Sequence, residues 1–401
     1  MRMQHTLLAA AALSVLSTAA SAVDWGGYMR IGPGQKVEAG NGDRSNCFNG
    51  YADTGGKGGI GRLGNECNTY GEFGLSQAGK AGGIDYKALL MTNFYQAGSD
   101  IGDGNHQINV NQAYIEAKGF DVAPSQTFWV GRRFYGRADV HMDDAFIVNM
   151  TGSGAGVDGF DLGFGTLNVA VFRTAEQNPS TMPGDPHDAL ADIHGTRINL
   201  DLQGINTNPG GKLRVTTTFT KAKGTGGKSG AALSFQHNQT GLYGADNTLW
   251  LQFAQGSASM NQNFGGATND SGVKGWRIVE SPAWTKGPLT GQAMFTIGKE
   301  GPSNAKTSFN SLAGRVAYAV TNNFKIQGEL GTANSKPQGG QTARVTKFTI
   351  APTLSVGPNY YDRPELRFYV STFNFNDTYK ATQGLTKSSK SSVGIQAEIW
   401  F

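Results

Sequence analysis

The stretch that decides the fold runs from position 196 to 204 and reads Thr196-Arg197-Ile198-Asn199-Leu200-Asp201-Leu202-Gln203-Gly204. Ile198, Leu200 and Leu202 share one face, and the residues between them are charged or carry an amide. Because successive side chains of a β-strand point to opposite faces, this alternation predicts a strand with one apolar and one polar face.

The same alternation recurs along the chain. The apolar faces of three further segments consist of Leu213, Val215, Thr217 and Phe219; of Phe324, Ile326 and Leu330; and of Val393, Ile395, Ala397, Ile399 and Phe401. A soluble β-sandwich shows this pattern too, so alternation alone leaves both a sandwich and a membrane barrel open.

The N-terminus has the pattern of a secretory signal peptide. A positively charged start precedes the apolar run Leu7–Leu16, and the small residues Ala20-Ser21-Ala22 form a cleavage site. We expect residues 1–22 to be removed and residues 23–401 to form one domain. The apolar run is too short to be a membrane-spanning helix.

Composition favours the membrane barrel. The 401 residues include 58 Gly and only 13 Pro, and 38% are apolar although 10% are aromatic. No stretch after the signal reaches the length of an apolar helical span, and long helical patterns are absent. With an export signal, these features predict an all-β, antiparallel transmembrane barrel in the outer membrane, which leaves no unpaired strand edge in lipid.

Turn-rich segments of alternating short and long lengths agree with this fold. The segments expected to be external loops are Gly40–Gly61, Ala97–Asn105, Asn178–His187, Gly224–Gly230, Asn261–Gly272 and Gly331–Gly340.

Several polar faces carry an aromatic residue beside a charged or amide residue. The pairs are Tyr28 with Arg30, Tyr70 with Glu72, Trp250 with Gln252, and Trp400 with Gln396 and Glu398. An inward aromatic can merely fill space or belong to an interfacial girdle, and Trp400 can simply pack near the periplasmic rim. Repetition of the pairing on separate strands favours a functional track.

Charge is concentrated in the stretch Gly131–Asp144, which holds three Arg, three Asp and one His, although only 16% of the chain is charged. We expect it to fold into the lumen and line the narrowest point. A salt bridge between Arg137 and Asp139 that only holds the loop remains an alternative. His141 is expected to be a structural hydrogen-bonding residue.

The two cysteines, Cys47 and Cys67, lie twenty residues apart. In an exported protein an even count at this spacing favours a disulfide that staples a loop. A metal site would need more ligands, and no His lies between them.

Several functional classes are disfavoured. The formal net charge of +4 is too small and dispersed to suggest nucleic acid. Two matches to the dinucleotide-binding glycine pattern, at 59–64 and 154–159, do not follow an apolar strand and open a helix. We expect no cofactor and no metal, and no enzyme, although a Ser/His/Asp set that meets only in space stays open.

Several motifs, in this order along the chain, resemble those of the maltoporin family of outer-membrane carbohydrate porins. The matching stretches are Val23–Arg30, Arg62–Tyr70, Arg133–Arg137 with Asp139–Asp144, Gly154–Gly156 with Asp161–Gly165, and Glu398–Phe401.

The resemblance implies a homotrimer of 18-stranded barrels that passes linear α-glucosides along an aromatic slide flanked by ionic residues. It also implies that the cysteines pair in the first external loop. Carried over by motif, the slide residues are Tyr28, Tyr70 and Trp400, with Phe375 as a further candidate where the family has a tryptophan. The polar-track residues are Arg30, Arg62, Glu72, Arg137, Asp139 and Asp144.

Some positions depart from the family pattern. Phe146 stands where the family has its constriction tyrosine, and Asn111 or a neighbour stands where it has an arginine. The second-loop tryptophan of the family has no counterpart in Ala97–Asn105. Tyr243 and Trp250 lie near the position of its mid-chain slide phenylalanine.

The expected function is facilitated diffusion of maltose, maltodextrins or related oligosaccharides. Flat aromatic faces suit the apolar faces of a pyranose, and charged side chains suit its hydroxyl rim. The alternative is a general or weakly anion-selective porin, in which the charged stretch only sets pore size and field. A barrel enzyme is a third class.

Overall fold

The computed structural model describes residues 23–32, 35–37, 59–66, 68–96, 107–174, 194–223, 228–265 and 272–401. They form a large antiparallel sheet and a separate two-stranded one. The large sheet closes on itself, because its first strand, 24–31, pairs with the strand at 69–81 on one side and with the last strand on the other. Two short segments, β1 (Asp24–Ile31) and β2 (Gln35–Val37), both pair with the last strand and together make one strand of the wall. The expected 18-stranded all-β barrel is confirmed, and no helix in the described residues is long and apolar enough to span a membrane.

The remaining wall strands follow in chain order around the barrel. They are β3 (Thr69–Ala81), β4 (Ile84–Gln96), β5 (Gln107–Phe120), β6 (Ala123–Arg133), β9 (Gly152–Asp161), β10 (Thr166–Thr174), β11 (His194–Asn206), β12 (Gly211–Lys223), β13 (Gly230–Leu242), β14 (Ala245–Gln255), β15 (Lys274–Lys286), β16 (Leu289–Gly301), β17 (Thr307–Ala319), β18 (Phe324–Pro337), β19 (Ala343–Ser355), β20 (Glu365–Phe375) and β21 (Ser389–Trp400).

The two faces of each strand divide as the alternation predicted. On β11, Ile198 is 40% exposed on the outer wall, whereas Arg197 is buried inside. On β18, Leu330 is 58% exposed and its neighbour Glu329 is buried. The apolar side chains therefore face lipid, and the polar side chains face the lumen.

The two ends of the barrel differ in the length of their connections. Turns of two residues, such as Gly82–Gly83 and Gly287–Pro288, lie at one end. The connection from β6 to β9, residues 134–151, and the described residues 256–265 and 272–273 of the connection from β14 to β15 lie at the other. Because outer-membrane barrels have short periplasmic turns and longer external loops, the second end is external.

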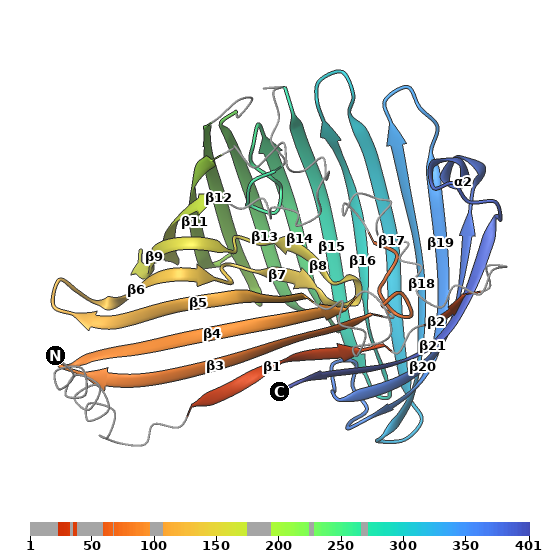
Figure 1. The fold of residues 1–401 in the computed structure, drawn as a ribbon, viewed down its shortest axis with the longest axis horizontal. Helices are drawn as coiled ribbons and strands as arrows, with labels where there is room; N and C mark the ends of the chain where they lie inside the picture. Colours follow the sequence, from red (N-terminus) through yellow and green to blue (C-terminus); the bar gives the residue numbers. More distant parts are fainter. Residues whose placement is uncertain are drawn as a thin grey trace, which may run out of the picture.

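One external connection folds into the lumen, where Figure 1 shows its two short strands against the upright strands of the wall. It contains β7 (Ala138–Val140), the 3₁₀ turn η3 (His141–Asp143) and β8 (Ala145–Val148). The expected start at Gly131 is wrong, since 131–133 continue the ladder of β6 with β5 and β9. The inward loop, named L3 below, begins at Phe134.

L3 is fixed to the wall by polar and apolar contacts. Gln252 Nε2 and Arg277 Nη2 donate to the carbonyl of Ile147 at 3.0 and 2.9 Å, and the N–H of Met142 donates to Gln292 Oε1 at 3.0 Å. Beside these bonds, buried apolar residues of L3 pack on Trp250 and others from the wall. A loop held this way keeps a fixed constriction.

One of the expected external loops is partly strand, and another starts at the external end but folds inward. Residues 331–337 of the segment Gly331–Gly340 extend β18. The glycine there allows a close approach rather than a turn, since a Cβ on Gly331 would lie 2.2 Å from the carbonyl oxygen of Ile60. The described part of Asn261–Gly272 folds inward, where Asn261 Nδ2 donates to the carbonyl of Phe146 at 2.7 Å.

A further inward segment, residues 59–66 of the first connection, is named L1 below. A short helix, α2 (Asp377–Thr382), caps the external end, and the side chain of Asn376 accepts from the N–H of Tyr379 at its start. Cys47, Cys67, residues 1–22 and the second loop at 97–105 lie outside the described residues.

Candidate functional site

A cavity of about 610 Å³ opens in the lumen between L3 and one side of the wall. Strands β1, β3, β4 and β21 form that side, and L1 adds one arginine. The lining residues are Tyr28, Arg30, Arg62, Tyr70, Glu72, Tyr95, Arg137, Asp139, His141, Asp144, Phe146 and Trp400. Aromatic rings and charged groups therefore share one cavity.

The structure brings together nearly all the site residues predicted from sequence. The cavity residues among them are Tyr28, Arg30, Arg62, Tyr70, Glu72, Arg137, Asp139, Asp144, Phe146 and Trp400. The exception is Phe375, which is buried and stacks on Tyr379 with ring centroids 5.1 Å apart.

The aromatic side of the cavity arises from strand register. Tyr28 is directly opposite Trp400 of β21, and the next inward residue of β1, Arg30, is opposite Tyr70 of β3. The rings of Tyr28 and Tyr70 lie 6.2 Å apart. Three rings from three adjacent strands thus follow one another across the closure of the barrel.

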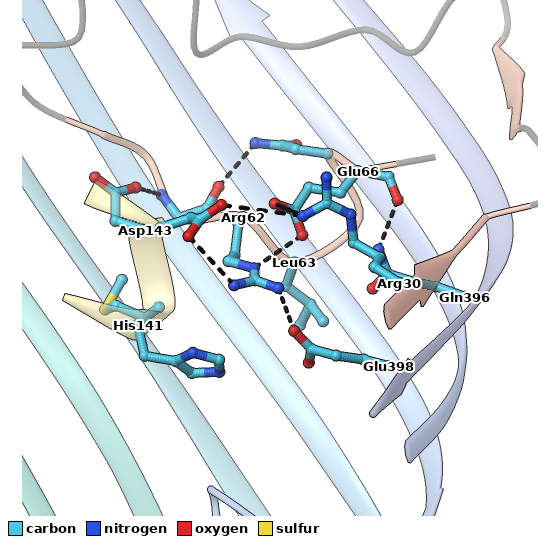
Figure 2. Close-up of polar contacts among 12 residues, drawn as sticks. Arg30, Arg62, Leu63, Glu66, His141, Asp143, Gln396 and Glu398 are labelled. Carbon is cyan, nitrogen blue, oxygen red and sulfur yellow. Dashed lines mark hydrogen bonds and ion pairs between the residues drawn. The ribbon is translucent and has the colours of Figure 1, made fainter. Parts of the chain in front are cut away.

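The polar side is built by Arg62, shown in Figure 2 at the centre of a network of polar contacts. Its guanidinium donates to Glu66 and to the Tyr28 hydroxyl, both at 2.8 Å, and pairs with Glu398. Arg30 Nη1 donates to the same Glu66 at 2.7 Å. These bonds hold both arginines in place behind the Tyr28 ring.

Asp144 projects a carboxylate toward these arginines from L3. It lies in the left-handed backbone region at φ 49°, which turns the chain after η3. Its oxygens lie 4.0 Å from Arg30 Nη1 and 3.9 Å from Arg62 Nη1, and its side chain is 46% exposed. Acceptor oxygens therefore remain accessible from the cavity.

Arg137 is held by stacking rather than by a salt bridge. Its guanidinium carbon lies 4.0 Å from the ring centroid of Phe134 and 3.9 Å from that of Phe146. No ion pair joins it to Asp139, so the alternative in which a salt bridge between these two residues only holds the loop is not what the structure shows. Stacking leaves the edge of the planar guanidinium, which carries its N–H donors, open to a ligand.

His141 is a structural element of the cavity rim. Arg363 Nη2 lies 3.0 Å from its Nε2. Since a guanidinium can only donate, Nε2 must accept, and the proton of the neutral ring sits on Nδ1. Burial, aided by the nearby Arg62 charge, holds the pKa of His141 well below its ordinary value.

Asp143, the neighbour of Asp144, points away from the cavity and joins L3 to L1. Its Oδ1 accepts from the N–H of Gly61 at 2.9 Å, and the carbonyl of Met142 accepts from the N–H of Arg62 at 2.9 Å. A Cβ on Gly59 would lie 1.7 Å from Asp143 Oδ2, so any larger residue at position 59 would displace this carboxylate. Burial raises the pKa of the Asp143 carboxyl to about 7.

Comparisons with known proteins agree with this architecture. The model of the LamB porin family matches residues 23–401. The chain belongs to the LamB porin family. It is 30% identical to a protein of Hahella chejuensis named maltoporin, over 98% of this chain and 96% of that one. It is 28% identical to a protein of Yersinia pseudotuberculosis named maltoporin 2, over 100% and 99% of the two chains.

Solved structures share the fold. A BenF-like porin from Pseudomonas fluorescens Pf-5 matches with a TM-score of 0.52 at 10% identity, over 94% of this chain and 99% of that chain. Membership of the LamB porin family, together with the closed barrel, makes the protein a multi-pass β-barrel of the bacterial outer membrane and a channel rather than an enzyme, as expected from the sequence.

Positions where this porin departs from the family pattern have defined places. Asn111 Nδ2 donates to Glu72 Oε1 at 3.0 Å and to the Tyr70 hydroxyl at 3.3 Å, so it takes part in the polar side. Trp250 faces the lumen but lies buried beneath L3. Tyr243 is fully exposed in a two-residue turn and faces no cavity.

Sequence reasoning missed two tyrosines of the porin. Tyr95 on β4 lines the cavity. Tyr361, in the connection from β19 to β20, lies with its ring 5.6 Å from that of His141, which in turn lies 5.6 Å from Trp400. The adjacent Tyr360-Tyr361 pair in a turn-rich segment was an available signal. In the described residues, no group of His, Cys, Asp and Glu is placed to hold a metal.

Proposed function

We propose that this porin mediates facilitated diffusion of maltose, maltodextrins or related oligosaccharides, with the rings of Tyr28, Tyr70 and Trp400 as a slide. The observation that carries the proposal is the single cavity in which these rings face a charged rim. The names of its family relatives support the choice of sugar.

The two sides of the cavity suit the two kinds of sugar surface. The rings offer flat apolar faces to the C–H faces of a pyranose, each contact contributing ~0.5–1.5 kcal/mol by analogy with aromatic pairs. Asp144 and Asp139 offer acceptors and Arg137 offers donors to the hydroxyls. Several weak contacts in series let a sugar enter and still leave, so that flow follows the gradient.

Phe146 sets the local chemistry at the constriction. Its ring stacks on Arg137 and has no hydroxyl to donate to a sugar. Hydrogen bonding at this point falls to the Arg137 guanidinium instead. We infer that the porin selects sugars by the spacing of their hydroxyls relative to this guanidinium.

Conductance measurements on the reconstituted porin test the proposal. Maltohexaose, sucrose and a non-glucoside sugar are titrated while the ion current through single channels is recorded. We expect saturable block by at least one glucoside. Ohmic conduction that no sugar blocks would instead identify a general or weakly anion-selective porin.

We further propose a homotrimer, as the family resemblance implies. Cross-linking of the porin in its native membrane should give a three-chain product. The resemblance predicts Phe375 as a further slide residue, but its ring is buried against Tyr379, so the proposed slide does not include it. The Cys47–Cys67 disulfide remains a prediction from the cysteine count and spacing and from the resemblance.

A further inference from the structure

A groove of about 380 Å³ lies on the outer surface of the barrel, across strands β13 to β16. Its walls combine three large apolar side chains with three lysines. The lining residues are Ala231, Ala232, Leu233, Phe253, Ala254, Gln255, Lys274, Gly275, Trp276, Lys299 and Lys306. The groove is separate from the lumen cavity and shares no residue with it.

Strand register explains the shape of the groove. Leu233, Phe253 and Trp276 stand opposite one another on successive strands, and Lys299 of β16 ends that row. The adjacent row toward the end of the strands contains the small Ala231 and then Gln255 and Lys274. Ala231 has only a methyl group, so the surface is hollow where large side chains flank it.

The groove lies at the external end of the barrel. Its residues sit near the start of β13 and β15 and the end of β14 and β16, away from the two-residue turn Tyr243–Gly244. Lys306 comes from the external connection between β16 and β17. Apolar residues thus face the acyl region, and the lysines face the headgroup level of the outer leaflet.

The three lysines have no acidic partner among the described residues. No ion pair involves Lys274, Lys299 or Lys306 within the described part of the chain, and the described lining holds no acidic residue. Lysines at a membrane boundary reach for water in any case. Three of them around one hollow with an apolar floor present a more specific arrangement, because they can converge on one anion.

We propose that this groove binds a phosphorylated lipid of the outer leaflet. One acyl chain lies along Leu233, Phe253 and Trp276, and the lysine ammonium groups donate to the phosphate oxygens. Charge-assisted hydrogen bonds and acyl burial then act together, which neither a neutral lipid nor a free phosphate can match.

Native mass spectrometry of the purified porin in detergent tests this site. Phosphatidic acid is titrated against wild type, against the double variant K274Q/K299Q, and against K336Q/K387Q. The control pair removes two exposed external lysines outside the groove. We expect K274Q/K299Q to weaken binding roughly tenfold or more, and the control to match wild type.

Two truncated ligands test the contributions of the phosphate and of the acyl chains separately. Diacylglycerol with the same chains lacks the phosphate, and glycerol phosphate lacks the chains; both should bind at least tenfold more weakly than phosphatidic acid. Equal loss in both double variants, or equal binding of either truncated ligand, would overturn the proposal. Sugar block should be unchanged in K274Q/K299Q, so this result stands apart from the transport function.

Discussion

Two sides of the lumen carry the same residue types but differ in how many of their charged groups remain accessible. On the strands β17 to β21, charged side chains pair with one another beneath L1 and are buried. Glu329 accepts from Arg315 Nε at 2.6 Å and from Lys347 Nζ at 2.5 Å, and neither it nor its partners are exposed. Around the cavity, Asp144 keeps nearly half its side chain exposed, and Arg137 is stacked rather than paired.

The difference comes from the loops, chiefly L1, and not from the strands; Arg315 Nη2 also donates to the carbonyl of Met142 in L3 at 3.2 Å. The Glu329 carboxylate also accepts from the N–H of Leu63 at 2.9 Å, and Lys347 Nζ donates to the carbonyls of Gly61 and Leu63. L1 thus covers one set of inward charges and leaves the other set facing the channel. Strand register determines which side chains point into the lumen. Whether an inward side chain lines the open channel depends on whether a loop covers it.

The largest effect is expected from breaking the covered side at Glu329. In Glu329→Gln, an amide with N–H donors replaces a carboxylate that three donor groups use, leaving Arg315 and Lys347 buried with reduced pairing. Removing one partner of a buried charge pair costs about 3–5 kcal/mol. Denaturant unfolding of the porin in detergent micelles should show a loss of this size.

The matched control is Glu72→Gln on the cavity side. Glu72 accepts from the Tyr70 hydroxyl and from Asn111 but lies at the accessible rim. Its loss should change the unfolding free energy by about 1 kcal/mol or less. Similar losses in the two variants would show that cover by L1 does not distinguish the two sides.

The pH dependence of stability tests the junction between the two loops. Because the pKa of Asp143 is raised from an ordinary value of 3.8 to about 7, folded chains keep this proton at pH 4–7 while unfolded chains release it. The folded state then binds more protons, so this group lowers the stability as pH rises from about 4 to about 7, and adds no slope above that range. The total change is on the order of a few kcal/mol.

Asp143→Asn should flatten this part of the pH profile, because an amide does not titrate. Unfolding free energies measured from pH 4 to 8 for both proteins give the comparison. Asp161→Asn is the control, since its exposed carboxylate accepts from the N–H of Gly163 in the turn after β9, away from L1 and L3. A wild-type slope that persists unchanged in Asp143→Asn would assign the titration to another group.

The sequence predicts strand register but not cover by a loop. Period-two alternation correctly predicted which residues of β11, β12, β18 and β21 face inward, because strand geometry alone sets that. The motifs placed Tyr28, Tyr70 and Trp400 in one cavity. Alternation could not reveal that the inward-facing Trp250 lies beneath L3, because cover comes from contacts distant in sequence. Nor could glycine content distinguish a turn from the close approach of Ile60 to Gly331.

Phe375 and Trp400 test directly whether burial by neighbouring side chains, which alternation does not predict, decides which inward rings contact the sugar. Both are inward aromatics predicted for the slide. Trp400 is 38% exposed in the cavity, whereas Phe375 is 6% exposed against Tyr379. If the slide consists of rings that the channel can reach, Trp400→Ala should weaken sugar block roughly three- to tenfold, the value of one aromatic contact. Phe375→Ala should leave it unchanged.

Single-channel titration with the best-blocking sugar measures both variants, and ion conductance provides the control. Trp400→Ala should conduct ions as well as wild type or better, because it removes bulk from the cavity. Phe375→Ala should instead lower the unfolding free energy by about 3–5 kcal/mol, as for other buried Phe truncations. Weakened block in Phe375→Ala with unchanged stability would mean that sugar reaches this ring, and that the slide extends beyond the cavity toward α2.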